Sequence, residues 1–285
     1  MSQHSDEVHS RTRFEFGANW SRFLSVVNDA RIEQAKNSLQ QMLECETLRG
    51  KMFLDVGSGS GLFSLAARSM NARVYSFDYD PESVACTREL KRRYYRQDAD
   101  WQIGEGSVLD TEYLGKLGKF DIVYSWGVLH HTGRMWDALE NVARLVRDTG
   151  KLYIAIYNDQ GGASKRWRLA KKIYNQLPRP LRLPYAALVM GAREIRAAVV
   201  SVARFKFGEY VRYRRDYSSH STRGMSYWHD VVDWIGGYPF EVATPEQIFD
   251  FYRTRGFVLT RLKIRTGLGC NEYVFTRTFL ESYKP

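Results

Sequence analysis

A glycine-rich run near the start of the chain has the composition of a ligand-binding turn. The sequence reads LDVGSGSG over residues 54–61 and follows a short apolar segment. Glycine lets the backbone turn tightly and approach a ligand without a Cβ clash. Free N–H groups at the start of the helix expected next favour a polar or anionic ligand. The candidate residues of this turn are Asp55, Gly57, Ser58, Gly59 and Gly61.

A carboxylate stands at the end of the next apolar segment, ARVYSFD, which closes with Asp78, 21 residues after Gly57. At the carboxyl end of a parallel strand, such a group can accept hydrogen bonds from both hydroxyls of a ribose. The pattern alone would allow a dinucleotide. However, the sequence motif of dinucleotide-binding turns is Gly-x-Gly-x-x-Gly, and here the third glycine, Gly61, comes one residue earlier than in that motif. The residues themselves therefore leave open which ribose-containing ligand binds here.

Two clusters contain a histidine that could act as a general base, which is useful when a hydroxyl must lose its proton. The first is His130 with His131, directly after the apolar segment at 120–127. The second comprises Tyr227, His229, Asp230, Asp233, Trp234, Tyr238 and Glu241. One histidine of the first pair could instead hold the loop through a backbone hydrogen bond. In the second cluster, Trp234 and Tyr238 could be packing residues and Asp230 an exposed helix cap. We expect the adjacent rings of His130 and His131 to point apart, and no spacing predicts a metal site.

The elements that must position these residues alternate between strands and helices, which predicts a parallel sheet covered on both faces. A helix over 31–48, with Gly50 as its stop, precedes the first strand at 51–57. Further strands are predicted at 72–78, 101–106, 120–127, 151–158, 257–264 and 271–277, and helices at 62–70, 81–95, 135–146 and 244–257. Residues 158–243 interrupt this alternation.

Composition excludes several classes of protein. The 285 residues include 44% hydrophobic ones, three cysteines and no long apolar run, so a disordered chain, a disulfide framework and a membrane span are not expected. We therefore expect a cytoplasmic protein. The net charge is +10, and the segment 158–243 holds 15 Lys and Arg against 7 Asp and Glu. That basic segment could bind an anionic small substrate, the surface of an anionic membrane or RNA, or it could be a solvated face.

The ordered set of motifs resembles the class I S-adenosylmethionine-dependent methyltransferases. Besides the glycine turn, the agreeing segments are VYSFDYDP, GEGSVLD, FDIVYSWGVLHHTG, RLVRDTGKLYIAIYN and the last two strands. The resemblance implies a Rossmann-like α/β fold with a seven-stranded, mostly parallel sheet, whose seventh strand is antiparallel, and helices on both faces. The expected domains are an N-terminal segment at 1–48 that covers the cofactor, a methyltransferase domain at 49–157 and 244–285, and a basic helical cap at 158–243, inserted after strand five.

The same resemblance assigns roles to residues. It implies that the glycines pack under the methionine part of S-adenosylmethionine, that Asp55 lies near its ammonium group and that Asp78 binds its ribose. It also implies contacts of the adenine with Tyr79, Ser107 and Val108, and a place for Ser125 and Trp126 near the methyl group. The family often has Asp where this chain has Ser107. Aromatic residues of the N-terminal segment, Phe16, Trp20 and Phe23, are expected to cover the cation, with Arg13 or Arg22 near the carboxylate.

The loop VLHHTG is similar to those of ubiquinone-biosynthesis and sugar methyltransferases. We therefore predict transfer of a methyl group from S-adenosylmethionine to a small or lipid-linked metabolite, most simply at oxygen, without a metal. The expected partners are an acceptor that the basic cap could bind as an anion and, through the same cap, a membrane surface, whereas nucleic acid is disfavoured. The alternatives are an RNA methyltransferase and a catalytically silent binding protein. The sequence leaves the acceptor, the methylated atom and the oligomeric state open.

Overall fold

The sheet has seven strands in the order β3-β2-β1-β4-β5-β7-β6, and β7 runs antiparallel to both of its neighbours. The computed structural model describes residues 7–8, 10, 13–17, 20, 24–25, 27–215, 231, 234–265, 267 and 269–278. The strands are β1 (Met52–Val56), β2 (Arg73–Asp78), β3 (Trp101–Glu105), β4 (Phe120–Trp126), β5 (Val146–Tyr157), β6 (Phe257–Lys263) and β7 (Cys270–Arg277). The strand order reverses between β1 and β4, and the carboxyl ends of parallel strands around such a point form the usual ligand crevice.

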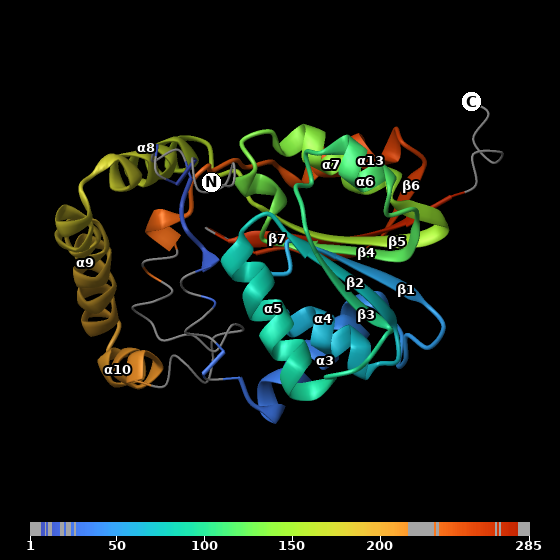
Figure 1. Ribbon diagram of the computed structural model, residues 1–285. Helices are drawn as coiled ribbons and strands as arrows, with labels where there is room; N and C mark the ends of the chain where they lie inside the picture. Colours follow the sequence, from blue (N-terminus) through green and yellow to red (C-terminus); the bar gives the residue numbers. More distant parts are fainter. Residues whose placement is uncertain are drawn as a thin grey trace.

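Helices cover both faces of the sheet, as predicted. Figure 1 shows α3 (Asp29–Leu43), α4 (Leu62–Ser69) and α5 (Pro81–Tyr94) on one face. The other face carries α6 (Thr111–Gly115), α7 (Met135–Arg144) and α13 (Pro245–Arg253). Capping residues fix the starts of two of these helices. Asp80 caps α5 directly before a proline, and Thr244 forms a capping box with Gln247 at the start of α13.

Each face of the central strands packs into its own hydrophobic core, because successive side chains of a strand point to opposite faces. On β1, Phe53 packs into the core beneath α3 and α4, whereas Leu54 and Val56 pack into the core beneath α7 and α13. Burial on both faces fixes the register of β1 and holds the turn that follows it.

Several predicted boundaries are wrong, and a short helix before β4 was not predicted. Helix α3 ends at Leu43 rather than at 48, because Glu44 adopts a left-handed conformation (φ 55°) that closes the helix without glycine. Strand β5 begins at Val146, earlier than predicted, since a bulge keeps residues 146–150 in the strand. The five-residue helix α6 is capped by Asp110 and is too short to show a helical period.

After β5 the chain leaves the sheet and forms three helices, α8 (Gly162–Gln176), α9 (Arg179–Ala203) and α10 (Phe207–Arg215). Figure 1 shows them as an arm at one end of the sheet. A bridge between Asn158 and Ala243 joins the two ends of this excursion. Helix α8 is attached to segment 234–240 through Asn175, whose Nδ2 donates to the Gly236 carbonyl at 2.7 Å. None of the helices in the described part of the chain is long and apolar enough to cross a bilayer.

Candidate functional site

The glycine turn after β1 has a backbone that favours glycine at each of its three Gly positions. Gly57, Gly59 and Gly61 all have positive φ, at 77°, 55° and 81°. A β-carbon at Gly57 would lie 2.5 Å from a methyl of Val128, and one at Gly59 would lie 3.0 Å from the indole of Trp20. The turn therefore permits close approach from the loop after β4 and from the N-terminal segment.

Asp78 is tied to the glycine turn by a direct hydrogen bond. The backbone N–H of Gly59 donates to Asp78 Oδ2 at 2.8 Å, and that of Asp80 donates to Oδ1 at 3.0 Å. Burial raises the pKa of Asp78 to about 6, so the group is largely ionised at neutral pH. A partly exposed, ionised carboxylate can accept further hydrogen bonds from the hydroxyl groups of a ligand.

Asp55 lies beneath the turn and is only 2% exposed. Its Oδ2 accepts a hydrogen bond from the Ser64 hydroxyl at 2.5 Å. Burial is the main cause that raises the pKa of Asp55 to about 7, and the nearby negative charge of Asp78 acts in the same direction. The site therefore holds two carboxyl groups that titrate near neutral pH.

The end of β4 is locked to the end of β1. Ser125 is fully buried, and its hydroxyl donates to the Val56 carbonyl at 3.0 Å. Trp126 is partly buried against the core beneath α3 and α4. Val128, next in the loop, touches Gly57 as described above and accepts the His131 N–H at 2.8 Å. The loop therefore brings the short 3-10 helix Leu129–His131 to the crevice that contains the glycine turn.

His131 is held in one orientation by two backbone contacts. Its Nδ1 lies 2.6 Å from the Pro239 carbonyl oxygen, and its own carbonyl accepts a hydrogen bond from Arg13 Nη1 at 3.0 Å. Because a carbonyl oxygen only accepts, Nδ1 must carry the proton. The neutral ring therefore has its basic lone pair on Nε2, which is the tautomer that a general base requires. The ring packs 5.1 Å from that of Phe16.

His130 serves mainly in packing. It is fully buried, its ring lies 4.0 Å from that of Tyr157, and its Nδ1 accepts the Tyr157 N–H at 3.4 Å. The rings of His130 and His131 do not point apart as expected, since they meet edge to face at 4.5 Å. The geometry thus favours His131 over His130 as a base.

The turn after β3 lies beside Asp78, because the Gly106 N–H donates to the Asp78 carbonyl at 3.0 Å. The Ser107 hydroxyl accepts the Leu109 N–H at 3.1 Å, so it stabilises the turn itself. Val108 is buried in the core beneath α7 and α13, which leaves no part of its side chain to contact an adenine. The expected adenine contact of Val108 is therefore restricted to its backbone.

The N-terminal segment crosses the carboxyl end of β2. The guanidinium of Arg13 lies 5.1 Å from the centre of the Tyr79 ring, and Gly17 N–H donates to Asp80 Oδ2 at 2.7 Å. Trp20 lies against Gly59, as the close approach to that glycine shows. These contacts bring Arg13, Phe16, Trp20 and Tyr79 to the predicted crevice. Arg22 and Phe23 lie outside the described residues.

Only part of the second candidate cluster is described. Tyr227, His229, Asp230 and Asp233 lie outside the described residues. The Trp234 ring packs 5.4 Å from that of Tyr157, and the Tyr238 carbonyl accepts the Phe14 N–H at 3.0 Å. Glu241 Oε2 accepts the Met135 N–H at 3.1 Å at the start of α7, and burial raises the pKa of this carboxyl. The Glu241 carboxylate thus holds an end of a helix.

Two residues of this region were missed by sequence reasoning. Tyr157 ends β5 and packs against both histidine rings, at 4.0 Å and 5.5 Å. Lys171 of α8 is fully buried, with its Nζ 4.3 Å from the centre of the Trp234 ring and hydrogen-bonded to the Trp234 carbonyl. The place of Tyr157 at the carboxyl end of a predicted strand could have indicated that it lies near the site. The sequence gives no such indication for Lys171, because a lysine in a basic helix is expected to be solvated.

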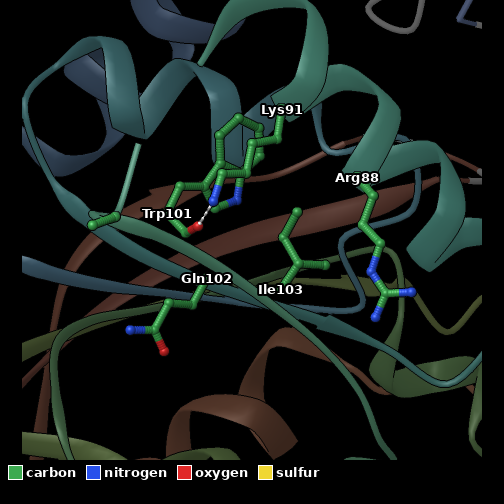
Figure 2. A pocket seen from close by; sticks show the side chains of 6 residues that line it. Arg88, Lys91, Trp101, Gln102 and Ile103 are labelled. Carbon is green, nitrogen blue, oxygen red and sulfur yellow. Dashed lines mark hydrogen bonds between the residues drawn. The ribbon is translucent and has the colours of Figure 1, made fainter. Parts of the chain in front are cut away.

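Neither a metal site nor the hollow in Figure 2 competes with this crevice. Within the described ranges, no group of three or more His, Cys, Asp or Glu side chains could hold a metal ion. The hollow, of about 450 Å³, lies beside the edge strand β3 and is lined by Arg88, Lys91, Ala99, Trp101, Gln102 and Ile103. Figure 2 shows Lys91 bonded to the Trp101 carbonyl across it. The hollow includes none of the residues of the glycine turn.

Part of the chain is similar in sequence to known proteins. Residues 54–152 match a family described as "Methyltransferase domain". The ribosomal protein L11 methyltransferase of Helicobacter hepaticus is 34% identical over 77 residues, which are 27% of this chain and 23% of that protein. The ubiquinone biosynthesis O-methyltransferase of Xanthomonas oryzae pv. oryzae is 31% identical over 111 residues, 39% of this chain and 45% of that protein. The matches thus span less than half the length of these two curated relatives.

A solved structure shows that the likeness of fold extends beyond the matched segment. The magnesium protoporphyrin IX methyltransferase of Synechocystis PCC 6803 aligns with a TM-score of 0.52 over 88% of this chain and 89% of that one. At 14% identity this similarity concerns the fold alone. The sheet order and the glycine turn agree with the match over 54–152, and this part of the chain is therefore similar to a methyltransferase domain.

Proposed function

We propose that the chain binds S-adenosylmethionine at the glycine turn and transfers its methyl group to a small or lipid-linked acceptor, at an oxygen atom. The observation that carries this proposal is the hydrogen bond of 2.8 Å between Gly59 N–H and Asp78. It couples a turn that a backbone-close ligand needs to a carboxylate that can hold a ribose. When bound, the cofactor would supply an activated methyl group on a positively charged sulfur.

The residues present fit this cofactor. Asp78 is a partly exposed carboxylate that can accept hydrogen bonds from ribose hydroxyls. Asp55 offers a carboxyl that ionises near neutral pH to an ammonium group. The indole of Trp20 lies beside Gly59, and an aromatic face there favours a cationic ligand. The chain itself then has to align the acceptor with the methyl group, because in-line displacement gains most from orientation.

His131 would act as the general base. With Nδ1–H directed at the Pro239 carbonyl, Nε2 would take the proton of an acceptor hydroxyl as the acceptor oxygen forms its bond to the methyl carbon. The bond from that carbon to the sulfur would break at the same time, and the sulfur would leave as a neutral thioether. Phe16 and Tyr157 flank the ring of His131 and give its surroundings an aromatic character suited to a ring-bearing acceptor. The similarity to a ubiquinone biosynthesis O-methyltransferase supports an oxygen acceptor.

Binding tests the first half of the proposal. S-adenosylhomocysteine should bind the full chain in a calorimetric titration, and Asp78→Ala should weaken binding by about tenfold or more through lost hydrogen bonds to a charged group. Glu112→Ala is the control, because this carboxylate is exposed and pairs only along its own helix with Lys116. A wild-type protein that does not bind, or an Asp78→Ala variant that binds equally well, would refute the cofactor site.

Turnover tests the second half. The protein is incubated with methyl-deuterated S-adenosylmethionine and with polar and lipid extracts, and mass spectrometry detects the labelled product. His131→Asn keeps an N–H for the Pro239 carbonyl but removes the base, so cofactor affinity should persist while turnover falls by about 10²–10⁴. Cofactor binding without any labelled product would instead support a catalytically silent protein.

A further inference from the structure

The arm formed by α8, α9 and α10 holds an extreme concentration of positive charge. Between residues 162 and 215 the sequence has 14 Lys and Arg against two acidic residues, Glu194 and Glu209. This segment therefore has a formal charge of +12, more than the +10 of the whole chain. A surface of this kind attracts anionic partners over a distance of about one Debye length.

Among the described residues, the same arm carries most of the large apolar side chains that are exposed. Of the 18 large hydrophobic side chains that are exposed in the described part of the chain, 12 lie between Leu169 and Val211. Single exposed hydrophobic residues are common, but a contiguous set marks a surface that is covered by something else. A purely solvated basic face would not need them.

Helix α9 separates its buried and exposed apolar residues onto opposite sides. Ala186 and Met190 are 0% and 4% exposed, in the part of α9 that packs toward α8. Leu188, Ile195 and Val202, seven residues apart, are 73%, 68% and 56% exposed and lie on the other side of the helix. The fold therefore leaves one long apolar face of α9 without cover from the described residues.

Phe205, at the turn between α9 and α10, presents its aromatic ring to solvent. It is 99% exposed, and its φ of 56° is left-handed, a conformation that glycine usually provides at a helix end. The hydrogen bonds Phe205 N–H to Val202 O (2.9 Å) and Lys206 N–H to Ser201 O (2.8 Å) define this helix end. The phenyl ring stands in solvent between two cations, Arg204 and Lys206.

We propose that the outer face of α9, with the Phe205 turn and α10, docks on the surface of an anionic lipid bilayer. Apolar side chains would enter the boundary of the acyl chains while the adjacent Lys and Arg side chains meet lipid phosphates. A second copy of the chain is a poor occupant, since a symmetric contact would bring two strongly basic segments together. Nucleic acid would match the charge but leave Leu188, Ile195 and Phe205 in water. The proposal does not rest on methyl transfer, because docking requires neither cofactor nor acceptor.

Co-sedimentation of the full chain with vesicles tests this proposal. The probes are phosphatidylcholine vesicles and vesicles that also contain phosphatidylglycerol, and we expect strong binding to the second kind alone. Phe205→Gly is the main variant, since glycine suits the left-handed turn and should leave folding intact or improve it. It should lower the partition coefficient about tenfold or more, which corresponds to loss of one buried phenyl group. Arg204→Glu should lower it about fivefold or more through the lost lipid contact.

The matched control is Phe249→Ala on α13, which alters another exposed phenylalanine outside the arm and should bind vesicles like the wild type. Absence of sedimentation with anionic vesicles would overturn the proposal. So would a Phe205→Gly variant that binds as well as the wild type while Arg204→Glu binds weakly, because attraction would then be electrostatic only and would point to nucleic acid. A concentration-dependent dimer that Phe205→Gly dissociates would identify a second copy as the occupant and also overturn it.

Discussion

The two carboxyl groups at the glycine turn should make cofactor binding depend on pH. Burial raises the pKa of Asp55 to about 7 and that of Asp78 to about 6. A ligand with an ammonium group and two ribose hydroxyls stabilises the ionised forms, so it lowers both pKa values when it binds. Binding then releases protons, and affinity must rise as pH rises through the values of the free protein.

The size of the effect follows from these pKa values. If the ligand returns both groups to an ordinary pKa of about 4, affinity at about pH 8 exceeds that at about pH 6 roughly tenfold through Asp55 and roughly twofold through Asp78.

The stability of the unliganded protein has the opposite dependence on pH, because it falls as pH rises. Ionisation of Asp55 opposes folding above its ordinary pKa, and the penalty grows until about pH 7. Asp55→Asn should therefore raise the free energy of unfolding at about pH 8 by up to about 4 kcal/mol.

Calorimetric titration of S-adenosylhomocysteine, repeated across this pH range in buffers of different ionisation enthalpy, measures both affinity and proton release. Chemical denaturation of the unliganded protein measures the stability. The affinity of the wild type should rise about twentyfold from about pH 6 to about pH 8. The affinity of Asp55→Asn should rise only about twofold over the same range, through Asp78. An affinity that is flat with pH in the wild type, or an Asp55→Asn variant with unchanged pH dependence, would refute this reasoning.

Three further variants probe the packing around the site. Gly57→Ala should destabilise the protein by a few kcal/mol more than Gly50→Ala in denaturant titrations, because both have φ near 75° but only the first Cβ would meet another side chain. Equal losses would show that backbone strain alone matters. Ser64→Ala removes a hydrogen bond that lowers the pKa of Asp55, so the midpoint of the pH-dependent binding should move upward, and a downward shift would contradict this assignment. Asn175→Ala should cost about 1–3 kcal/mol, measured by thermal unfolding, since it leaves the Gly236 carbonyl without its donor.

The sequence by itself determined the architecture of the methyltransferase domain. Apolar segments ending in Gly57, Asp78 and Gly127 predicted three parallel strands, and their carboxyl ends predicted a common crevice. Such information is local: positive φ at a glycine, burial on both faces of a strand and an Asp or Thr before a helix all act over a few residues. For this reason the order of elements and the members of the glycine turn were predicted, whereas the end of α3 at Glu44 was not.

Only the tertiary structure decided which histidine has a basic nitrogen suited to catalysis. The sequence treats His130 and His131 alike, but Pro239, 108 residues away in the chain, accepts the Nδ1–H of His131, while the Tyr157 N–H occupies Nδ1 of His130. Burial and hydrogen bonding between distant segments likewise set the pKa values of Asp55 and Asp78 and hide Lys171 among aromatic rings. They also leave the outer face of α9 exposed. Ionisation, tautomer and exposure depend on neighbours that only folding brings together, so no local pattern encodes them.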